Sequence, residues 1–210
     1  MYLSRLILNP RSRAVQRDLA RPGEMHKTVL RAFPNNLAEG AERVLYRLDQ
    51  LLQTQQLCLL VQSQAAPDWK QLDPGYLQAE LTDNPAVKEV ALHLQAGQRL
   101  AFRLRANPTK RLSAGKGKIG KRIGLYKMEE QIHWLQRKSE QHGFVVQSTM
   151  PTQQQRIDQH SADRDLKFFS VQFDGILQVT DPAAFLAAIQ AGIGSGKAFG
   201  FGLLSVAPVR

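Results

Sequence analysis

The residue whose type and surroundings best suit chemistry is His26. It falls in the first turn of a helix that the sequence predicts over residues 24–33, one position away from an apolar stripe that includes Met25 and Val29. Free backbone N–H groups and the helix dipole favour a phosphate at the start of a helix. An imidazole at this place is therefore a candidate for proton transfer on a phosphate ester.

Three basic residues lie close to His26 in the sequence, namely Arg21, Lys27 and Arg31. Positive charge lowers the pKa of an imidazole, whereas a bound phosphate raises it, so this setting suits proton transfer near neutral pH. A histidine beside an apolar stripe is also a common packing residue. Position alone therefore leaves a catalytic and a structural role open.

The other histidines and the single cysteine give no pattern typical of a metal site. His93, His133, His142 and His160 show no convincing ligand spacing, and Cys58 has no cysteine partner. We therefore expect neither a bound metal nor another cofactor. One cysteine also excludes an internal disulfide, which suits the reducing cytoplasm.

A glycine-rich segment, GIGSGKAFGFG at residues 192–202, surrounds Lys197. It departs from a nucleotide-binding loop because Ala198 stands where a serine or threonine must follow the lysine. It also runs from a predicted helix into a strand, whereas phosphate-binding loops run from strand into helix. This disfavours a nucleotide-dependent enzyme and leaves either a connector or a loop whose backbone approaches RNA.

Basic charge is concentrated in one part of the chain. The protein carries a net charge of +10, and residues 99–127 contain ten basic residues and no acidic one. A weaker basic cluster lies near the N-terminus. Charge localised in this way is typical of a protein that binds a polyphosphate. A solvated basic loop is the alternative, and a membrane-surface helix is disfavoured because glycines interrupt the segment.

Hydrophobic periodicity predicts the elements of the first half. Residues 2–8, 43–48 and 57–63 are predicted strands, and Pro34 ends the helix predicted over residues 24–33. Residues 99–107 alternate most clearly, with Leu100, Phe102 and Leu104 on one face and arginines on the other. Such a strand suits a sheet that covers a core with one face and binds a charged ligand with the other.

The second half repeats this order of elements. The sequence predicts a helix over residues 127–142, with Met128, Ile132, Leu135 and Ser139 inward, and a strand over 144–149. Residues 166–173 and 176–180 are predicted to form a hairpin that turns at Asp174-Gly175. A last helix has Asp181 as N-cap, Pro182 as its first residue and Gly192 as C-cap, and a strand follows at 203–206.

These elements predict an α+β fold with two tandem ferredoxin-like (RRM-like) domains, each built on an antiparallel sheet. We place the N-terminal domain at residues 1–110, with the candidate histidine, and the C-terminal domain at residues 111–210, with the glycine-rich loop. The longest apolar run, residues 183–189, is too short to span a bilayer, and arginines interrupt the start of the chain before any secretory signal develops. We therefore expect a cytoplasmic protein without membrane attachment.

Several sequence blocks resemble the CasE-type CRISPR RNA endoribonucleases, in the same order from end to end. These are MYLSRLILNP at 1–10, RDL at 17–19, RLRANPTK at 103–110, EQIHWLQRK at 130–138, QFDG at 172–175, GIGSGK at 192–197 and GLLSVAP at 202–208. The resemblance implies two ferredoxin-like domains that bind a CRISPR repeat RNA hairpin and cut at the 3′ base of its stem. It also implies that the enzyme keeps its product and joins other subunits of the type I-E complex, Cascade.

The catalytic histidine of the family matches His26. A relative carries a tyrosine three residues before that histidine, where this sequence has Gly23. The role of that tyrosine must be absent here or filled by another residue, and the sequence leaves Tyr2, Tyr46 and Tyr126 open as substitutes.

Metal-independent RNA cleavage uses the substrate's own 2′-OH, which attacks the adjacent phosphorus and leaves a 2′,3′-cyclic phosphate. Under this hypothesis His26 is general acid or base, and Lys27 and Arg31 stabilise charge in the transition state. The RNA-binding residues that we predict are Arg21, Arg103, Arg105, Lys110, Arg111, Lys116, Lys118, Lys121, Arg122 and Lys197. The main alternative is a non-catalytic RNA-binding module of a ribonucleoprotein, which charge and fold alone do not separate from an enzyme.

Overall fold

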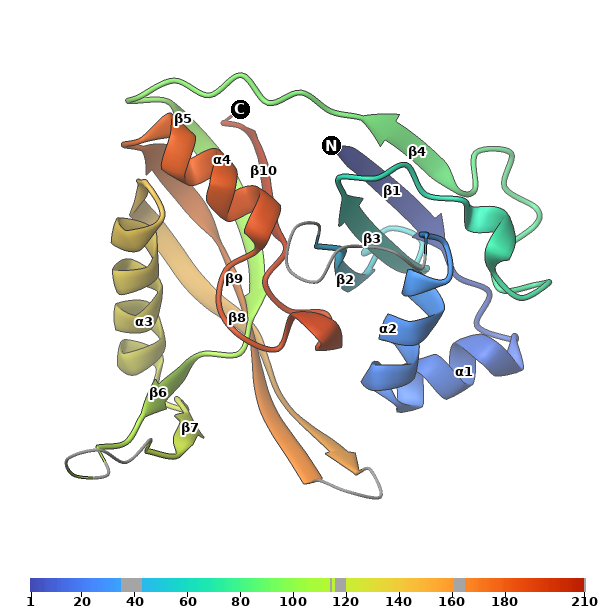
Figure 1. Ribbon diagram of the computed structural model, residues 1–210, viewed down its shortest axis with the longest axis horizontal. Helices are drawn as coiled ribbons and strands as arrows, with labels where there is room; N and C mark the ends of the chain where they lie inside the picture. The colour runs from blue at the N-terminus through green and yellow to red at the C-terminus, as the bar shows by residue number, and fades with distance from the viewer. Residues whose placement is uncertain (35–42, 114, 116–119, 161–164, 210) are drawn as a thin grey trace. The chain divides into compact units, whose positions relative to one another are not determined.

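The computed structural model describes residues 1–34, 43–113, 115, 120–160 and 165–209. The chain divides into two compact units (Figure 1). The first unit contains Met1–Leu92 and Lys197–Leu203, and the second contains His93–Gly196 and Leu204–Arg210. The boundary predicted after residue 110 falls inside the second unit. Among the described residues, the strand at residues 99–106 pairs with strands of that unit.

A four-stranded antiparallel sheet of order β2-β3-β1-β4 forms the first unit. Its strands are β1 (Tyr2–Ile7), β2 (Leu45–Gln50), β3 (Leu57–Ser63) and β4 (Ala86–Glu89). Helices α1 (Arg13–Ala20) and α2 (Pro22–Leu30) connect β1 to β2, and the 3₁₀ helix η1 (Trp69–Gln71) lies between β3 and β4. This strand order and connectivity are those of a ferredoxin-like domain whose second crossover helix is reduced to one turn.

The core of the first unit lies between this sheet and the two helices. Leu6 and Leu59 from the sheet pack with Val15 from α1 and with Met25 and Val29 from α2, and all five are at most 3% exposed. The apolar stripe predicted for α2 is therefore confirmed. Helix α1 was not predicted, because only Val15 and the short Ala14 give it an apolar face.

The second unit repeats the arrangement with the sheet order β10-β5-β9-β8, again antiparallel throughout. Its strands are β5 (Arg99–Ala106), β8 (Phe144–His160), β9 (Asp165–Val179) and β10 (Leu204–Pro208). Helix α3 (Met128–Gln141) precedes β8, and α4 (Pro182–Ala191) follows β9 (Figure 1). A small hairpin of β6 (Thr109–Arg111) and β7 (Arg122–Gly124) lies between β5 and α3. The prediction of two tandem ferredoxin-like domains is thus confirmed.

The alternation predicted for β5 is also confirmed. Leu100, Phe102 and Leu104 are at most 5% exposed, whereas Arg99 and Arg103 are exposed on the other face. Both helices pack on the apolar face of the sheet: the ring of Trp134 in α3 stacks on Phe173 in β9 at 6.2 Å, and Phe185 in α4 lies 5.1 Å from Phe144 in β8. The prediction that Met128 faces inward is wrong, because this first residue of α3 is 48% exposed.

The predicted hairpin at Asp174-Gly175 is wrong, because β9 runs straight through both residues. Position 175 requires glycine for a reason other than a turn. A Cβ atom on Gly175 would lie 2.0 Å from the carbonyl oxygen of Ser148, at the bulge where β8 shifts register between Val146 and Ser148. Glycine is therefore required by a close approach of the neighbouring strand.

The ends predicted for the last helix are confirmed. Asp181 Oδ1 accepts hydrogen bonds from the backbone N–H groups of Ala183 and Ala184, both at 3.0 Å. Pro182 is the first helical residue, and Gly192 ends the helix with a φ of 74°. No helix in the described ranges is both long and apolar enough to cross a bilayer.

Candidate active site and basic surfaces

His26 is the fifth residue of α2, because the helix begins at Pro22 and not at residue 24 as predicted. The first turn therefore ends before the imidazole. It carries Glu24, and a carboxylate there is favoured by the positive end of the helix dipole. His26 lies one position from the buried Met25, so its ring is half-buried at the edge of the core.

The imidazole packs against the ring of Tyr46 in β2. The two ring centroids lie 6.1 Å apart, and the ring planes differ by 22°. The Nδ1 atom of His26 is buried and has no hydrogen-bond partner among the described residues. Burial lowers the pKa of His26, because desolvation disfavours the charged imidazolium. The direction agrees with the sequence expectation, but its cause is burial and not the neighbouring cations.

Tyr46 joins three parts of the first unit. Its side chain is buried, and its hydroxyl oxygen lies 2.8 Å from the carbonyl oxygen of Ala198 and 3.2 Å from that of Pro22. Ala198 belongs to the 3₁₀ helix η2 (Lys197–Phe199), which packs against α2 and β2. The glycine-rich segment thus reaches the histidine through Tyr46. Sequence spacing cannot reveal this contact, because Ala198 lies 152 positions after Tyr46.

Lys27 and Arg31 do not gather around His26. Lys27 Nζ lies 2.8 Å from Glu24 Oε1, and the Arg31 guanidinium makes two hydrogen bonds to the Asp73 carboxylate, at 2.9 and 3.2 Å. The hydrogen bond to Asp73 raises the pKa of Arg31. Lys27 and Arg31 also point away from His26, because adjacent helix positions differ in direction and five positions correspond to about 140° around the axis. The carboxylates of Glu24 and Asp73 therefore balance the charges of these two side chains.

Arg21 lies close to His26 along the chain, and Lys197 belongs to η2, which packs against the helix of His26. Arg21 is exposed at the N-cap position of α2, and Lys197 is the first residue of η2. Of the predicted RNA-binding residues, these two belong to the same unit as the histidine.

A buried carboxylate holds α1 against α2. Asp18 is 1% exposed and accepts a hydrogen bond of 2.9 Å from the hydroxyl of Tyr76. Arg17 forms an ion pair with the same carboxylate at 2.9 Å and lies 3.5 Å from Thr28 Oγ1 in α2. The RDL block of the sequence therefore supports the helix that carries His26. Its role in packing was not predicted.

In the second unit, the arginines of β5 have polar partners on β9. Arg103 forms an ion pair with Asp174, and Arg105 Nε donates to Ser170 Oγ at 2.8 Å. Gln172 Nε2 also donates to the Asp174 carboxylate, at 2.7 Å. The arginine face of the sheet therefore contains a carboxylate that balances part of its charge.

The β6–β7 hairpin of the second unit carries the densest described positive charge. Arg111 and Arg122 lie directly opposite each other in the strand register, and neither forms an ion pair with a described residue. Lys121 is exposed beside them, whereas Lys110 pairs with Glu130 at 2.7 Å. Like charges in directly opposite positions destabilise a hairpin, so this pair favours an anionic ligand. The predicted Lys116 and Lys118 lie outside the described residues.

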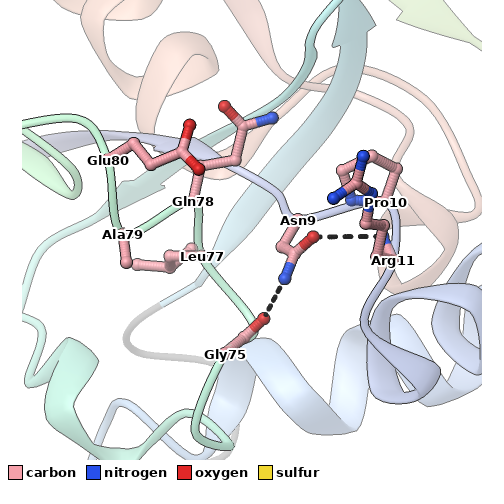
Figure 2. A pocket seen from close by; sticks show the side chains of 8 residues that line it. All are labelled: Asn9, Pro10, Arg11, Gly75, Leu77, Gln78, Ala79 and Glu80. Carbon is pink, nitrogen blue, oxygen red and sulfur yellow. Dashed lines mark hydrogen bonds between the residues drawn. The ribbon is translucent and has the colours of Figure 1, made fainter.

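The first unit contains a pocket of about 410 Å³ (Figure 2). Its walls include Asn9, whose side chain accepts from the backbone N–H of Arg11 at 3.1 Å and donates to the carbonyl oxygen of Gly75 at 3.0 Å. These contacts shape the loop after β1, and no candidate catalytic residue lines the pocket. Within the described parts of the chain, no three histidine, cysteine or acidic side chains gather as metal ligands would.

Comparison with known proteins adds a family and solved relatives. A family model described as CRISPR associated protein matches residues 1–208. The chain is 42% identical over 222 aligned residues to the CRISPR-associated endoribonuclease Cse3 of Thermus thermophilus, which covers 99% of this chain and 100% of that protein. It is 34% identical to the CRISPR system Cascade subunit CasE of Escherichia coli, with 100% of both covered. A structure of Thermus thermophilus Cse3 bound to an RNA representing a pre-cleavage complex has a TM-score of 0.86 at 42% identity, covering 99% of this chain and 98% of that one.

Proposed function

Because this chain belongs to the Cse3/CasE family of CRISPR-associated endoribonucleases, we propose that it binds the hairpin of CRISPR repeat RNA and cuts the precursor transcript at the 3′ base of the stem. The observation that carries this proposal is the half-buried imidazole of His26, held on α2 with a lowered pKa in a chain that matches these endoribonucleases over its whole length.

The reaction that we propose is attack of the 2′-OH on the adjacent phosphorus, without a metal. The attacking oxygen forms a bond to phosphorus as the bond to the 5′ oxygen breaks, and the leaving 5′ oxygen takes up a proton from solvent, which gives a 2′,3′-cyclic phosphate and a 5′-OH. We assign His26 as the proton acceptor for the 2′-OH, because a buried imidazole with a lowered pKa is neutral near pH 7. Holding the 2′-OH in line supplies the remaining acceleration.

Lys27 and Arg31 remain our candidates for stabilising charge on the transition state. Each is paired with a carboxylate, Lys27 with Glu24 and Arg31 with Asp73. To act on the scissile phosphate, each must therefore exchange this partner for a phosphate oxygen. Both ion pairs are exposed, so the exchange costs little free energy.

We assign RNA binding to the basic residues that the sequence predicted for this role. Double-stranded RNA is recognised mainly by shape and phosphates, so guanidinium and ammonium groups along the hairpin stem are the natural contacts. The proposed set in the second unit is Arg103, Arg105, Lys110, Arg111, Lys121 and Arg122, together with Lys116 and Lys118, and in the first unit Arg21 and Lys197. As the Escherichia coli relative is a Cascade subunit, we propose that this chain keeps its product in the same kind of cytoplasmic complex.

The deciding experiment measures cleavage of a cognate repeat hairpin in EDTA under single-turnover conditions. Wild type should cut it, whereas His26→Ala and a substrate with one 2′-deoxy nucleotide at the cut should bind but react at least about 10²-fold more slowly. His133→Ala is the matched control, because His133 is an exposed histidine on α3. Wild-type binding without any cleavage would instead make the chain a non-catalytic RNA-binding module.

A further inference from the structure

Tyr46 is the residue most closely tied to His26 in the first unit. It is 2% exposed although β2 is an edge strand, and its ring lies against the imidazole at 6.1 Å. Gly200 also lies close to the ring: a Cβ atom at that position would lie 3.2 Å from Cε2 of Tyr46. The phenol therefore fills a slot between the histidine and the glycine-rich segment.

The hydroxyl of Tyr46 connects two backbones that border the histidine. It lies 2.8 Å from the carbonyl oxygen of Ala198 in η2 and 3.2 Å from that of Pro22, the first residue of α2. A hydroxyl has one proton to donate, and the shorter distance assigns it to Ala198. This hydrogen bond holds η2 to β2, and the carbonyl oxygen of Pro22 lies close to the same hydroxyl.

The same contacts argue against proton transfer by Tyr46. Its proton is already donated to a carbonyl oxygen, and burial raises the pKa of the phenol. Tyr126 packs on Phe169 in the second unit, at 4.8 Å, and Tyr2 pairs with Ser63 and Glu89 inside the sheet. Of the three tyrosines that the sequence left open, Tyr46 is thus the one that contacts His26, and it does so through the face of its ring.

We propose that Tyr46 positions His26: its ring lies beside the imidazole, and its hydroxyl holds η2 to β2 by donating a hydrogen bond to Ala198. This inference rests on the proposed function, because positioning matters only if His26 transfers a proton. It assigns Tyr46 a mechanical role and not that of a proton donor.

Two substitutions of Tyr46 distinguish the contribution of its ring from that of its hydroxyl. Tyr46→Phe keeps the ring, so the NMR titration of His26 in RNA-free protein should match wild type, while single-turnover cleavage slows about 2- to 12-fold through the lost hydrogen bond. Tyr46→Leu removes the ring and exposes the imidazole to water. The titration midpoint of His26 should then rise toward its ordinary value, and cleavage should slow by at least about tenfold.

A glycine pair tests the same slot without touching the tyrosine. Gly200→Ala places a methyl group against the Tyr46 ring, whereas Gly75→Ala has nothing within 4 Å. Both glycines have a positive φ, of 79° and 73°, so both substitutions carry similar backbone strain. We expect Gly200→Ala, but not Gly75→Ala, to shift the His26 titration and slow cleavage.

The outcomes distinguish this inference from the proposed function. A Tyr46→Leu protein that is folded, binds the hairpin, and keeps the wild-type titration and rate overturns the inference and leaves the proposed function intact. Equal rate losses in Gly200→Ala and Gly75→Ala also overturn it, because strain alone then explains them. A wild-type protein that never cuts overturns the proposed function, and the His26 titrations still decide whether Tyr46 positions the imidazole.

Discussion

At the imidazole of His26, the local environment is set by one aromatic ring and by the loss of water around Nδ1. A histidine whose pKa is lowered by burial carries no charge at neutral pH and becomes protonated only at a pH below its ordinary value of about 6.5. As a proton acceptor it is active in the neutral form. The active fraction therefore grows as the pH rises through the lowered pKa.

The direction of this pKa shift predicts how the cleavage rate of the RNA-free enzyme depends on pH. With RNA below saturation, the cleavage rate should rise with pH along a limb whose midpoint lies below about 6.5, and it should level off near neutrality. His26→Ala should lack this limb, whereas the His133→Ala control should keep it. A rate that falls as the pH rises across this range would assign His26 as proton donor instead.

How far the sequence revealed the site differs from residue to residue. Local signals made His26 a candidate, namely a helix start, an apolar stripe and basic neighbours, but they left a packing role open and the family resemblance selected it. Tyr46 could not be ranked, because its partners Pro22 and Ala198 lie 24 and 152 positions away. Lys27 and Arg31 were chosen by proximity in the sequence, which does not reveal that carboxylates hold both.

At the scale of elements, β8 and β9 show how a strong local signal can mislead. The pair Asp174-Gly175 is typical of a hairpin turn, yet both residues lie inside β9, and the bulge in β8 explains the glycine. Elements such as β5 and α4 could be predicted because their signals are local. The alternation of β5 and the end residues of α4 lie within the sequence of each element. The bulge depends on the partner strand, so the sequence of β9 alone does not contain it.

The close approach at Gly175 predicts a large effect from one methyl group. Gly175→Ala should destabilise the protein by about 1–3 kcal/mol, because the new Cβ would lie 2.0 Å from a backbone oxygen that cannot rotate away. Gly124→Ala is the matched control, since its nearest neighbours are side-chain atoms of Tyr126 at 3.4 Å. Denaturant unfolding of both variants checks this. Equal midpoints for the two would contradict the close packing of β8 on β9.

For the whole molecule, the net charge of +10 is the property that governs encounter with RNA. Part of the local basic charge is balanced inside the structure, as in the pairs Arg103–Asp174 and Lys110–Glu130. The free charge that remains is most evident on the β6–β7 hairpin, at Arg111 and Arg122. The sequence predicted the concentration of charge, but it did not separate paired cations from unpaired ones.

This charge predicts a steep salt dependence of RNA binding. If about six phosphates are neutralised, affinity should fall by roughly 10³-fold between 50 and 200 mM salt. Arg122→Ala should reduce the slope of log affinity against log salt by about one. Arg137→Ala should leave the slope unchanged, since this exposed arginine lies on α3, on the side of the sheet away from the arginines of β5. A complex insensitive to salt would contradict phosphate contacts as the source of affinity.

The chain leaves the first unit after Leu92 and returns to it at Lys197. A ribosome makes the chain in order, so His26 and Tyr46 emerge long before Ala198, the residue that receives the tyrosine's hydrogen bond. At about 5–20 residues per second, this interval lasts on the order of ten seconds. Throughout that time the nascent protein has its histidine but lacks one wall of the surrounding site. If His26 is catalytic as we propose, cleavage activity should appear only after residues 197–203 have been synthesised and have folded back onto the first unit.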